Sequence, residues 1–170
     1  MFLFLKGEAM SLLSYYSVFK RITDINIKFL KDNNINTLLL DVDNTLSTHH
    51  GTKLVDGLDT WLSLMRQEGV KLIIISNSVK FRTEQFANKI DLPFISLAIK
   101  PLPFGYKKAI KLLGAEKNNT AIIGDQLFTD VLGANFYGIK PLLVRPIKLE
   151  KGLTFKIRRY FERKILKDKF

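Results

Sequence analysis

The stretch LLLDVDNT, residues 38–45, ends an apolar run with two acidic residues, Asp41 and Asp43. The run Thr37–Leu40 predicts a buried parallel strand, and the polar residues that follow it predict a loop. Both carboxylates would then lie at the carboxyl edge of a sheet, where open α/β folds bind their ligands. Two anions placed this close need a cation or a shared proton nearby. A solvent-exposed turn, in which Asp and Asn cap a helix, is the alternative interpretation of this stretch alone.

Segments with strand-like apolar runs alternate along the chain with segments of helical periodicity. The predicted strands are Thr37–Leu40, Val70–Ile75, Phe94–Ile99, Thr120–Ile123 and Ile139–Val144, and the predicted helices between them are Leu54–Glu68, Lys80–Ile90, Phe104–Leu113 and Leu127–Phe136. Alternation of this kind predicts right-handed βαβ crossovers. We therefore expect an α/β fold, a three-layer sandwich in which helices cover both faces of a central parallel sheet.

The length of the chain, 170 residues, suits a single domain, with its core over residues 37–146. Residues 10–33 carry apolar side chains at helical spacing, and residues 150–170 have the pattern of a basic amphipathic helix. Purine-rich codons resembling a ribosome-binding site are expected just before the Met10 codon, so we expect translation to start there. Residues 1–9 would then be an annotation artefact, and a genuine short extension is the alternative.

Composition excludes several classes of protein. The chain has no cysteine, which excludes disulfides, thiol catalysis and zinc sites built from cysteine. Its apolar stretches are shorter than the roughly 20 residues that span a bilayer. Charged residues follow the apolar Met1–Leu5, unlike the cleavage site of a secretory signal. We expect a soluble cytoplasmic protein, and peripheral contact with the inner face of the membrane is compatible with this expectation.

The net charge of the chain is +11 and is unevenly distributed. Residues 151–170 hold eight Lys or Arg and two acidic residues. A basic terminal segment beside a nearly balanced core indicates an anionic partner, such as a membrane surface or a nucleic acid. A solvated basic helix without a partner is the alternative.

Polar residues also follow three other predicted strands. Ser76 and Asn77 follow the second strand, Lys100 follows the third, and Asp125 ends the fourth with Asp130 five residues later. Each of these is ordinary when taken alone, because Ser and Asn often cap helices, a single lysine is usually a surface residue and Gly-Asp is a common turn. The four sites together and in this order indicate a functional site far more specifically than any one of them alone.

The four motifs Asp-x-Asp-x-Thr, Ser-Asn, Lys-Pro and Gly-Asp-x-x-x-x-Asp resemble those of the haloacid dehalogenase (HAD) superfamily of phosphohydrolases, over about residues 38–144. The resemblance implies a HAD-like, Rossmannoid fold and a phosphomonoesterase that works through an aspartyl phosphate. It implies that Asp41 is the nucleophile and that Asp43 is the general acid and base. Lys100 would stabilise the negative charge that develops in the transition state.

The resemblance also implies a Mg²⁺ site and a phosphate site. Mg²⁺ would be bound by the carboxylates of Asp41 and Asp125 and by the backbone carbonyl of Asp43. The residues expected at the phosphate are Ser76, the amide of Asn77, Lys100 and Thr45, which would support the loop. Asp130 would orient Lys100 or a metal-bound water from the second layer of residues.

The spacing of the motifs leaves no room for a large cap domain. Thirty residues separate Thr45 from Ser76, and 23 separate Ser76 from Lys100. A parallel crossover with its helix takes about a dozen residues or more. We therefore expect an open site, which would accept a large substrate or borrow a lid from another subunit.

The chain looks most like the YqeG branch of HAD subfamily III, which is similar to phosphatidylglycerophosphate phosphatases. The shared features are the DVDNTL block and Gly-Asp-Gln-x-x-Thr-Asp, including Gln126 and Thr129. They imply removal of the terminal phosphate of phosphatidylglycerophosphate, with the phosphorylated lipid presented at an anionic membrane surface. The alternatives are a capless phosphatase of a nucleotide, a nucleic-acid end or a sugar phosphate, and a non-catalytic binding protein on the same fold. The intact acid pair argues against a pure binding protein.

Overall fold

The computed structural model describes residues 12–48 and 53–148. Within these residues, six parallel strands form one sheet in the order β1-β6-β5-β2-β3-β4. The strands are β1 Ser17–Phe19, β2 Thr37–Leu40, β3 Lys71–Ile75, β4 Phe94–Ile95, β5 Thr120–Gly124 and β6 Lys140–Val144. The residues of the predicted N-terminal extension, 1–9, and of the predicted basic helix, 150–170, lie outside the described part of the chain.

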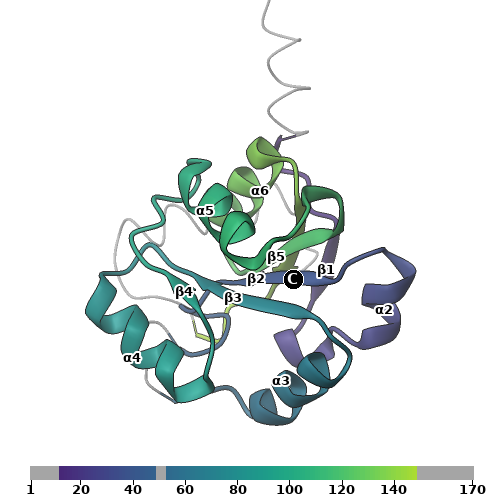
Figure 1. Ribbon diagram of the computed structural model, residues 1–170, viewed down its shortest axis with the longest axis vertical. Coiled ribbons are helices and arrows are strands. Elements are labelled where there is room, and N and C mark those ends of the chain that lie inside the picture. The colour runs from purple at the N-terminus through teal and green to yellow at the C-terminus, as the bar shows by residue number, and fades with distance from the viewer. Residues whose placement is uncertain (1–11, 49–52, 149–170) are drawn as a thin grey trace, which may run out of the picture.

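Helices cover both faces of this sheet, as Figure 1 shows. One face carries α5 (Phe104–Leu113) and α6 (Leu132–Tyr137). The other face carries α2 (Ile27–Asp32), α3 (Leu58–Gln67) and α4 (Lys80–Ile90). The shorter helical turns are η1 Ile22–Asp24, η2 Lys117–Asn119 and the π-helical turn η3 Leu127–Val131. The expected α/β sandwich with a central parallel sheet is therefore confirmed.

Strand β2 lies inside the sheet, between β5 and β3, and its side chains pack into both hydrophobic cores. Leu38 and Leu40 pack into the core under α2, α3 and α4, whereas Leu39 packs into the core under α5. Alternation along a strand produces this division. The end of β2 is aligned with its neighbours, since Leu40 pairs with Ile74 of β3 and Ile123 of β5. The residues that follow these three strands therefore meet at one edge of the sheet.

The prediction of a helical segment over residues 10–33 is wrong for its middle part. Residues Ser17–Phe19 form β1, which pairs in parallel with β6, and α2 begins only at Ile27. The backbone N–H of Tyr16 also donates to the carbonyl of Pro141, at 2.8 Å. An unpaired edge of β6 would leave backbone N–H and C=O groups without hydrogen-bond partners. Pairing with Ser17–Phe19 satisfies them, and these residues are therefore extended although their apolar side chains have helical spacing.

Two other predicted elements are shorter than expected. The third predicted strand, Phe94–Ile99, ends at Ile95 as β4. Its continuation is impossible because Leu97 and Ile99 have positive φ angles of 46° and 55°. The first predicted helix, Leu54–Glu68, begins at Leu58, because Leu54 instead forms a backbone bridge with Ser47.

No large cap domain interrupts the described part of the fold, as the spacing of the motifs predicted. The described residues between Thr45 and Ser76 contain α3 and β3, and those between Ser76 and Lys100 contain α4 and β4. Among the described residues, none of the helices has the length and apolar character needed to cross a membrane.

Candidate active site

The predicted site residues meet at the carboxyl edge of the sheet. Asp41 directly follows β2, and its backbone N–H donates to the carbonyl of Ile123 at 2.9 Å. Ser76 directly follows β3, and Asp125 directly follows β5. Asp41, Ser76 and Asp125 are all buried. The open carboxyl edge, a common ligand site in such folds, here carries three buried polar side chains.

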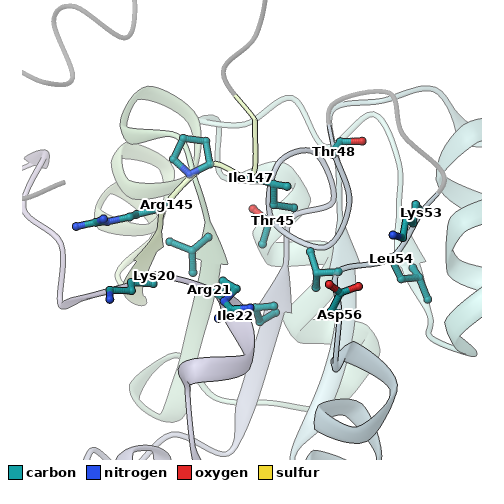
Figure 2. Close-up of a pocket in the computed structure, with 13 residues that line it drawn as sticks. Lys20, Arg21, Ile22, Thr45, Thr48, Lys53, Leu54, Asp56, Arg145 and Ile147 are labelled. Carbon is teal, nitrogen blue, oxygen red and sulfur yellow. The ribbon is translucent and has the colours of Figure 1, made fainter.

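The loop after β2 folds tightly over the sheet edge and borders a pocket. The N–H groups of Leu46 and Ser47 both donate to the carbonyl of Val42, at 3.0 and 3.2 Å. Thr45 is 2% exposed, and its hydroxyl has no hydrogen-bond partner among the described residues. Figure 2 shows Thr45 in the wall of this pocket, which has a volume of about 410 Å³. The charged residues that line the pocket are Lys20, Arg21, Lys53, Asp56 and Arg145.

Lys100 forms the centre of a buried cluster of charges. Its Nζ lies 2.6 Å from Oδ1 of Asp41 and 2.7 Å from Oδ1 of Asp130. The side chains of Lys100 and Asp130 are both 2% exposed. Taking these charges out of water is costly, and only their mutual pairing and hydrogen bonds offset the cost. Lys100 therefore holds the predicted nucleophile directly.

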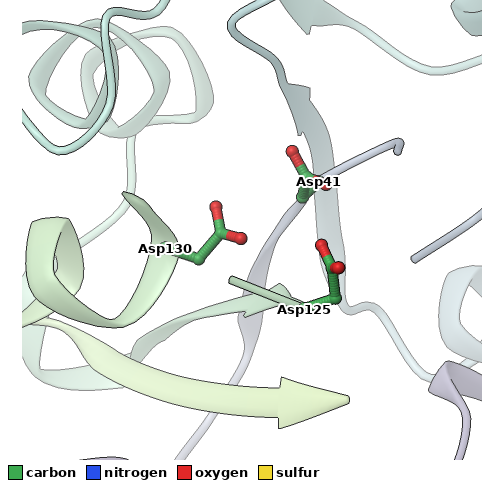
Figure 3. A group of neighbouring side chains, drawn as sticks. All are labelled: Asp41, Asp125 and Asp130. Atoms are coloured by element: carbon green, nitrogen blue, oxygen red, sulfur yellow. The ribbon is translucent and has the colours of Figure 1, made fainter. Parts of the chain in front are cut away.

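A third carboxylate joins the cluster. Asp41, Asp125 and Asp130 each offer an oxygen, and these oxygens all lie within 4.8 Å of one another. Figure 3 shows Asp41 and Asp125 on neighbouring strand ends and Asp130 on the helical turn beside them. Oδ2 of Asp41 is buried and has no hydrogen-bond partner among the described residues. Three carboxylates around one ammonium leave an excess of negative charge, which favours a bound cation with a preference for oxygen ligands.

The electrostatics of the cluster shift the acidity of its members. Burial raises the pKa of Asp41 to about 7, and the charge of Asp130 adds to the rise while Lys100 opposes it. Burial alone would lower the pKa of Lys100, but Asp130 and Asp41 together raise it above its ordinary value. Lys100 is therefore a permanent cation in the site.

The sequence between Gly124 and Asp130 explains how Asp130 reaches Lys100. The π-helical turn η3 begins after Gln126, and the backbone N–H of Gln126 donates to Oδ2 of Asp130 at 3.2 Å. The hydroxyl of Thr129 donates to Oε1 of Gln126, also at 3.2 Å. A Cβ at Gly124 would lie 2.3 Å from the carboxyl group of Asp130. Only glycine leaves room for this carboxyl group, and π-helical turns are frequent at functional sites.

The side chain of Asn77 fixes the backbone of Lys100. Its Nδ2 donates to the carbonyl of Lys100 at 3.0 Å, and the N–H of Lys100 donates to Oδ1 of Asn77 at 2.7 Å. Both polar atoms of the side-chain amide are thus hydrogen-bonded to the backbone of Lys100, and the backbone amide of Asn77 is the group assigned to the predicted phosphate contact. The Oγ of Ser76 accepts a hydrogen bond from the N–H of Ser78 at 3.1 Å.

Arg82 is a site residue that the sequence analysis missed. Its guanidinium contacts both carboxylate oxygens of Asp43, with Nη1 at 3.1 Å from Oδ2 and Nη2 against Oδ1. Nη1 also donates to Oγ of Ser78 at 2.9 Å. Bidentate pairing of this kind fixes the orientation of a carboxylate. The available signal was the spacing of four residues between Ser78 and Arg82, which places both on one face of the turn that starts α4.

Comparisons with known proteins identify a family model and a relative that match most of the chain. The chain matches the model of the mitochondrial PGP phosphatase family over residues 10–148. It is 34% identical over 147 residues to the probable phosphatase YqeG of Bacillus subtilis, and the match covers 86% of each chain.

Two solved structures show the same fold at low sequence identity. An uncharacterized protein from Listeria monocytogenes serotype 4b has a TM-score of 0.57 and 16% identity, with 70% of this chain and 85% of that chain covered. A protein of Streptomyces avermitilis named as a HAD family hydrolase has a TM-score of 0.51 and 17% identity, with 65% and 71% covered.

Replacement of Lys100 by Met should destabilise the folded protein, because it leaves Asp41 and Asp130 as buried carboxylates without their cation. We expect the free energy of unfolding at pH 8 to fall by about 3–5 kcal/mol. The loss should be smaller at pH 5, because Asp41, whose pKa is raised to about 7 even beside Lys100, then takes up a proton and no longer needs a cation. Urea unfolding without divalent cations measures both values.

Lys107 provides the matched control, because it lies exposed on α5. Replacement of Lys107 by Met should change the free energy of unfolding by less than about 0.5 kcal/mol. Equal stability of the two variants at pH 8 would contradict the role of Lys100 in the cluster.

Proposed function

Because the chain belongs to the mitochondrial PGP phosphatase family of HAD-type hydrolases, we propose that it is a Mg²⁺-dependent phosphatase that converts phosphatidylglycerophosphate to phosphatidylglycerol. The observation that carries the chemistry is the buried contact of Lys100 with Asp41 at the sheet edge. A carboxylate held there by a fixed cation suits attack on a phosphoryl group, whose negative charge would otherwise repel it.

The reaction proceeds in two displacements. An oxygen of Asp41 attacks phosphorus, and the bond from phosphorus to the glycerol oxygen breaks as Asp43 gives its proton to that oxygen. Phosphatidylglycerol leaves, and Asp41 carries the phosphoryl group. Asp43 then takes a proton from a water molecule, which attacks phosphorus and releases inorganic phosphate. Both steps need Asp43 in one position, first as acid and then as base.

The surrounding residues bind and orient the reacting groups. Lys100 lies 2.6 Å from Oδ1 of Asp41, close enough for its charge to act on the phosphoryl oxygens during both displacements. Ser76 and the backbone amide of Asn77 would bind these oxygens as neutral donors. Once Asp43 has given up its proton, Arg82, through its contacts with both carboxylate oxygens, would hold it in the orientation needed to take a proton from water.

The acidic cluster fits a magnesium ion. It offers buried carboxylate oxygens, the ligand type that this hard cation prefers, and an excess of negative charge that needs a cation. Asp41 and Asp125, together with the backbone carbonyl of Asp43, would hold the ion. Bound Mg²⁺ would neutralise charge between the nucleophile and the incoming phosphate. Asp130 directs its two oxygens to Lys100 and to the N–H of Gln126, so its proposed role is to orient Lys100.

The proposed lipid substrate is supported by the description of the family and by the surroundings of the site. Phosphatidylglycerophosphate carries a diester phosphate in addition to its terminal phosphate. The pocket beside Thr45 is lined by four basic residues and one acidic residue, a charge balance that suits a second anionic group. Figure 2 shows Lys20, Arg21 and Arg145 on one side of Thr45 and Lys53 on the other. The absence of a large cap between the described elements leaves access for a bulky lipid.

Phosphate release with Mg²⁺ tests the substrate. We expect faster turnover of phosphatidylglycerophosphate in mixed micelles than of a nucleotide or a sugar phosphate, and no turnover of any of them by the variant Asp41→Asn. Removal of divalent cations by a chelator should abolish activity, and added Mg²⁺ should restore it. Strong activity on soluble phosphates without activity on the lipid would reject the lipid substrate but not the phosphatase chemistry.

Replacement of Arg82 by Ala should lower kcat by about 10–100-fold, because the proton carrier Asp43 loses the group that orients it. The KM should change less, since no phosphate contact is assigned to Arg82. Steady-state kinetics on one substrate measures both constants.

Arg66 is the control for this variant, because its guanidinium on α3 donates to the carbonyl of Asp91 and lies away from the site residues. Replacement of Arg66 by Ala should leave kcat unchanged. A normal kcat for Arg82→Ala would show that the contact with Asp43 has no role in turnover.

A further inference from the structure

Six large apolar side chains are exposed on the loops beside Lys100. They come from the loop before α4, the first turn of that helix, the segment between β4 and α5, and the first residue of α5. Their exposed fractions are 60% for Val79, 71% for Phe81, 58% for Leu97, 59% for Ile99, 46% for Leu102 and 67% for Phe104. We call this set the apolar rim.

Backbone contacts join the two segments of the apolar rim into one surface. The N–H of Leu97 donates to the carbonyl of Ser78 at 3.0 Å, which brings Leu97 beside Val79. The N–H of Leu102 donates to the carbonyl of Ile99 at 2.9 Å. The first of these hydrogen bonds joins the two segments, as does the one from the N–H of Ala98 to the carbonyl of Ser76 at 3.0 Å, and the second closes a turn within the segment before α5.

The backbone conformation directs the rim outward. Ala98 and Lys100 are 2% and 5% exposed, whereas Leu97 and Ile99, which alternate with them, have positive φ angles and are exposed. A positive φ is costly for a β-branched residue such as Ile99. Strained conformations of this kind persist mainly at functional sites. The same backbone that buries Lys100 thus exposes two apolar side chains.

The apolar rim borders the candidate active site. Val79 and Phe81 lie between Ser78 and Arg82 in the chain. Ser78 and Arg82 both contact Asp43. Ile99 directly precedes Lys100, which contacts Asp41, and Leu97 lies three residues before it. Exposed apolar residues elsewhere on the described surface, such as Leu112 and Phe136, do not adjoin these residues along the chain. Single exposed apolar residues are common, but a group of this kind usually marks an interaction surface.

We propose that the apolar rim inserts into an anionic lipid bilayer and holds the active site against the headgroups. Basic residues stand next to the rim: Lys80 lies between Val79 and Phe81, and Lys107 and Lys108 follow Phe104 on α5. All three lysines are exposed, and Glu84 is the one acidic residue in α4 and α5. Apolar side chains bordered by lysines are complementary to acyl chains beneath anionic headgroups.

The choice of a membrane as partner rests on the proposed lipid substrate, but insertion can be measured without turnover. The variants Phe81→Trp and Phe104→Trp each place a fluorescent side chain in the rim. The native Trp61 is 5% exposed and donates to the carbonyl of Ile25 at 2.7 Å, so it provides a constant background in the core. Phe136→Trp on α6 is the matched control, since Phe136 is 55% exposed outside the rim.

Vesicles of phosphatidylglycerol and phosphatidylcholine with brominated acyl chains would quench a tryptophan that enters the bilayer. We expect Phe81→Trp and Phe104→Trp to lose fluorescence on these vesicles relative to unbrominated ones, and Phe136→Trp to keep it. Equal signals on the two kinds of vesicle for both rim variants, or equal quenching in the control, would overturn the proposal.

A second measurement compares rates. The double variant Phe81→Ser/Phe104→Ser should hydrolyse vesicle-borne phosphatidylglycerophosphate about tenfold more slowly or worse, because each buried aromatic ring contributes strongly to partitioning. Its rate on a soluble phosphomonoester should match that of the wild type, which also shows that it folds. Leu112→Ser/Phe136→Ser should match the wild type on both substrates.

The outcomes separate the apolar rim from the proposed function. Lipid hydrolysis by the wild type without rim quenching would overturn the rim proposal alone. Rim quenching without lipid hydrolysis would support the rim proposal and overturn the substrate. A dimer that the Phe81→Ser/Phe104→Ser variant fails to form, together with no quenching, would assign the rim to a second copy of the chain and overturn the membrane proposal.

Discussion

The contact of Lys100 with Asp41 and Asp130 is the constraint on which the rest of the site depends. A buried ammonium needs its two carboxylates, and each carboxylate needs the ammonium, so the three groups fix one another. Neighbouring residues then hold these three groups in position. Asn77 fixes the backbone of Lys100, and Gly124 leaves space for the carboxyl group of Asp130. The parallel register of the central strands brings these parts to one edge.

Much of this arrangement could be predicted from the sequence, because polar residues directly after apolar runs have one natural place in a parallel sheet. The positions of Asp41, Ser76 and Asp125 follow from that rule. Strand β1 could not be predicted in this way, since its pairing with β6 satisfies backbone groups that leave no side-chain pattern. Arg82 was missed because a basic residue at the start of a helix is usually solvated, and only its contact with Asp43 distinguishes it.

The loops next to α4 and α5 contribute both to the candidate active site and to the apolar rim. The segment before α5 buries Ala98 and Lys100 and exposes Leu97 and Ile99, so a single backbone path supplies a cation to the site and apolar groups to the surface. Across the loop after β2, the pocket beside Thr45 has basic walls. A phosphorylated lipid has a polar headgroup and apolar chains, and the two surfaces match these two parts. The proposed membrane orientation would present both surfaces to the lipid.

Asp41 is the proposed nucleophile, and Lys100 is the group that would control its charge and position. Acid quenching during turnover of a phosphomonoester, followed by proteolysis and mass spectrometry, locates any phosphoryl group on the protein. We expect a phosphoryl group on Asp41 during turnover that disappears once the substrate is exhausted and that is absent from Asp41→Asn. A phosphoryl group on a different residue during turnover would show that Asp41 is not the nucleophile.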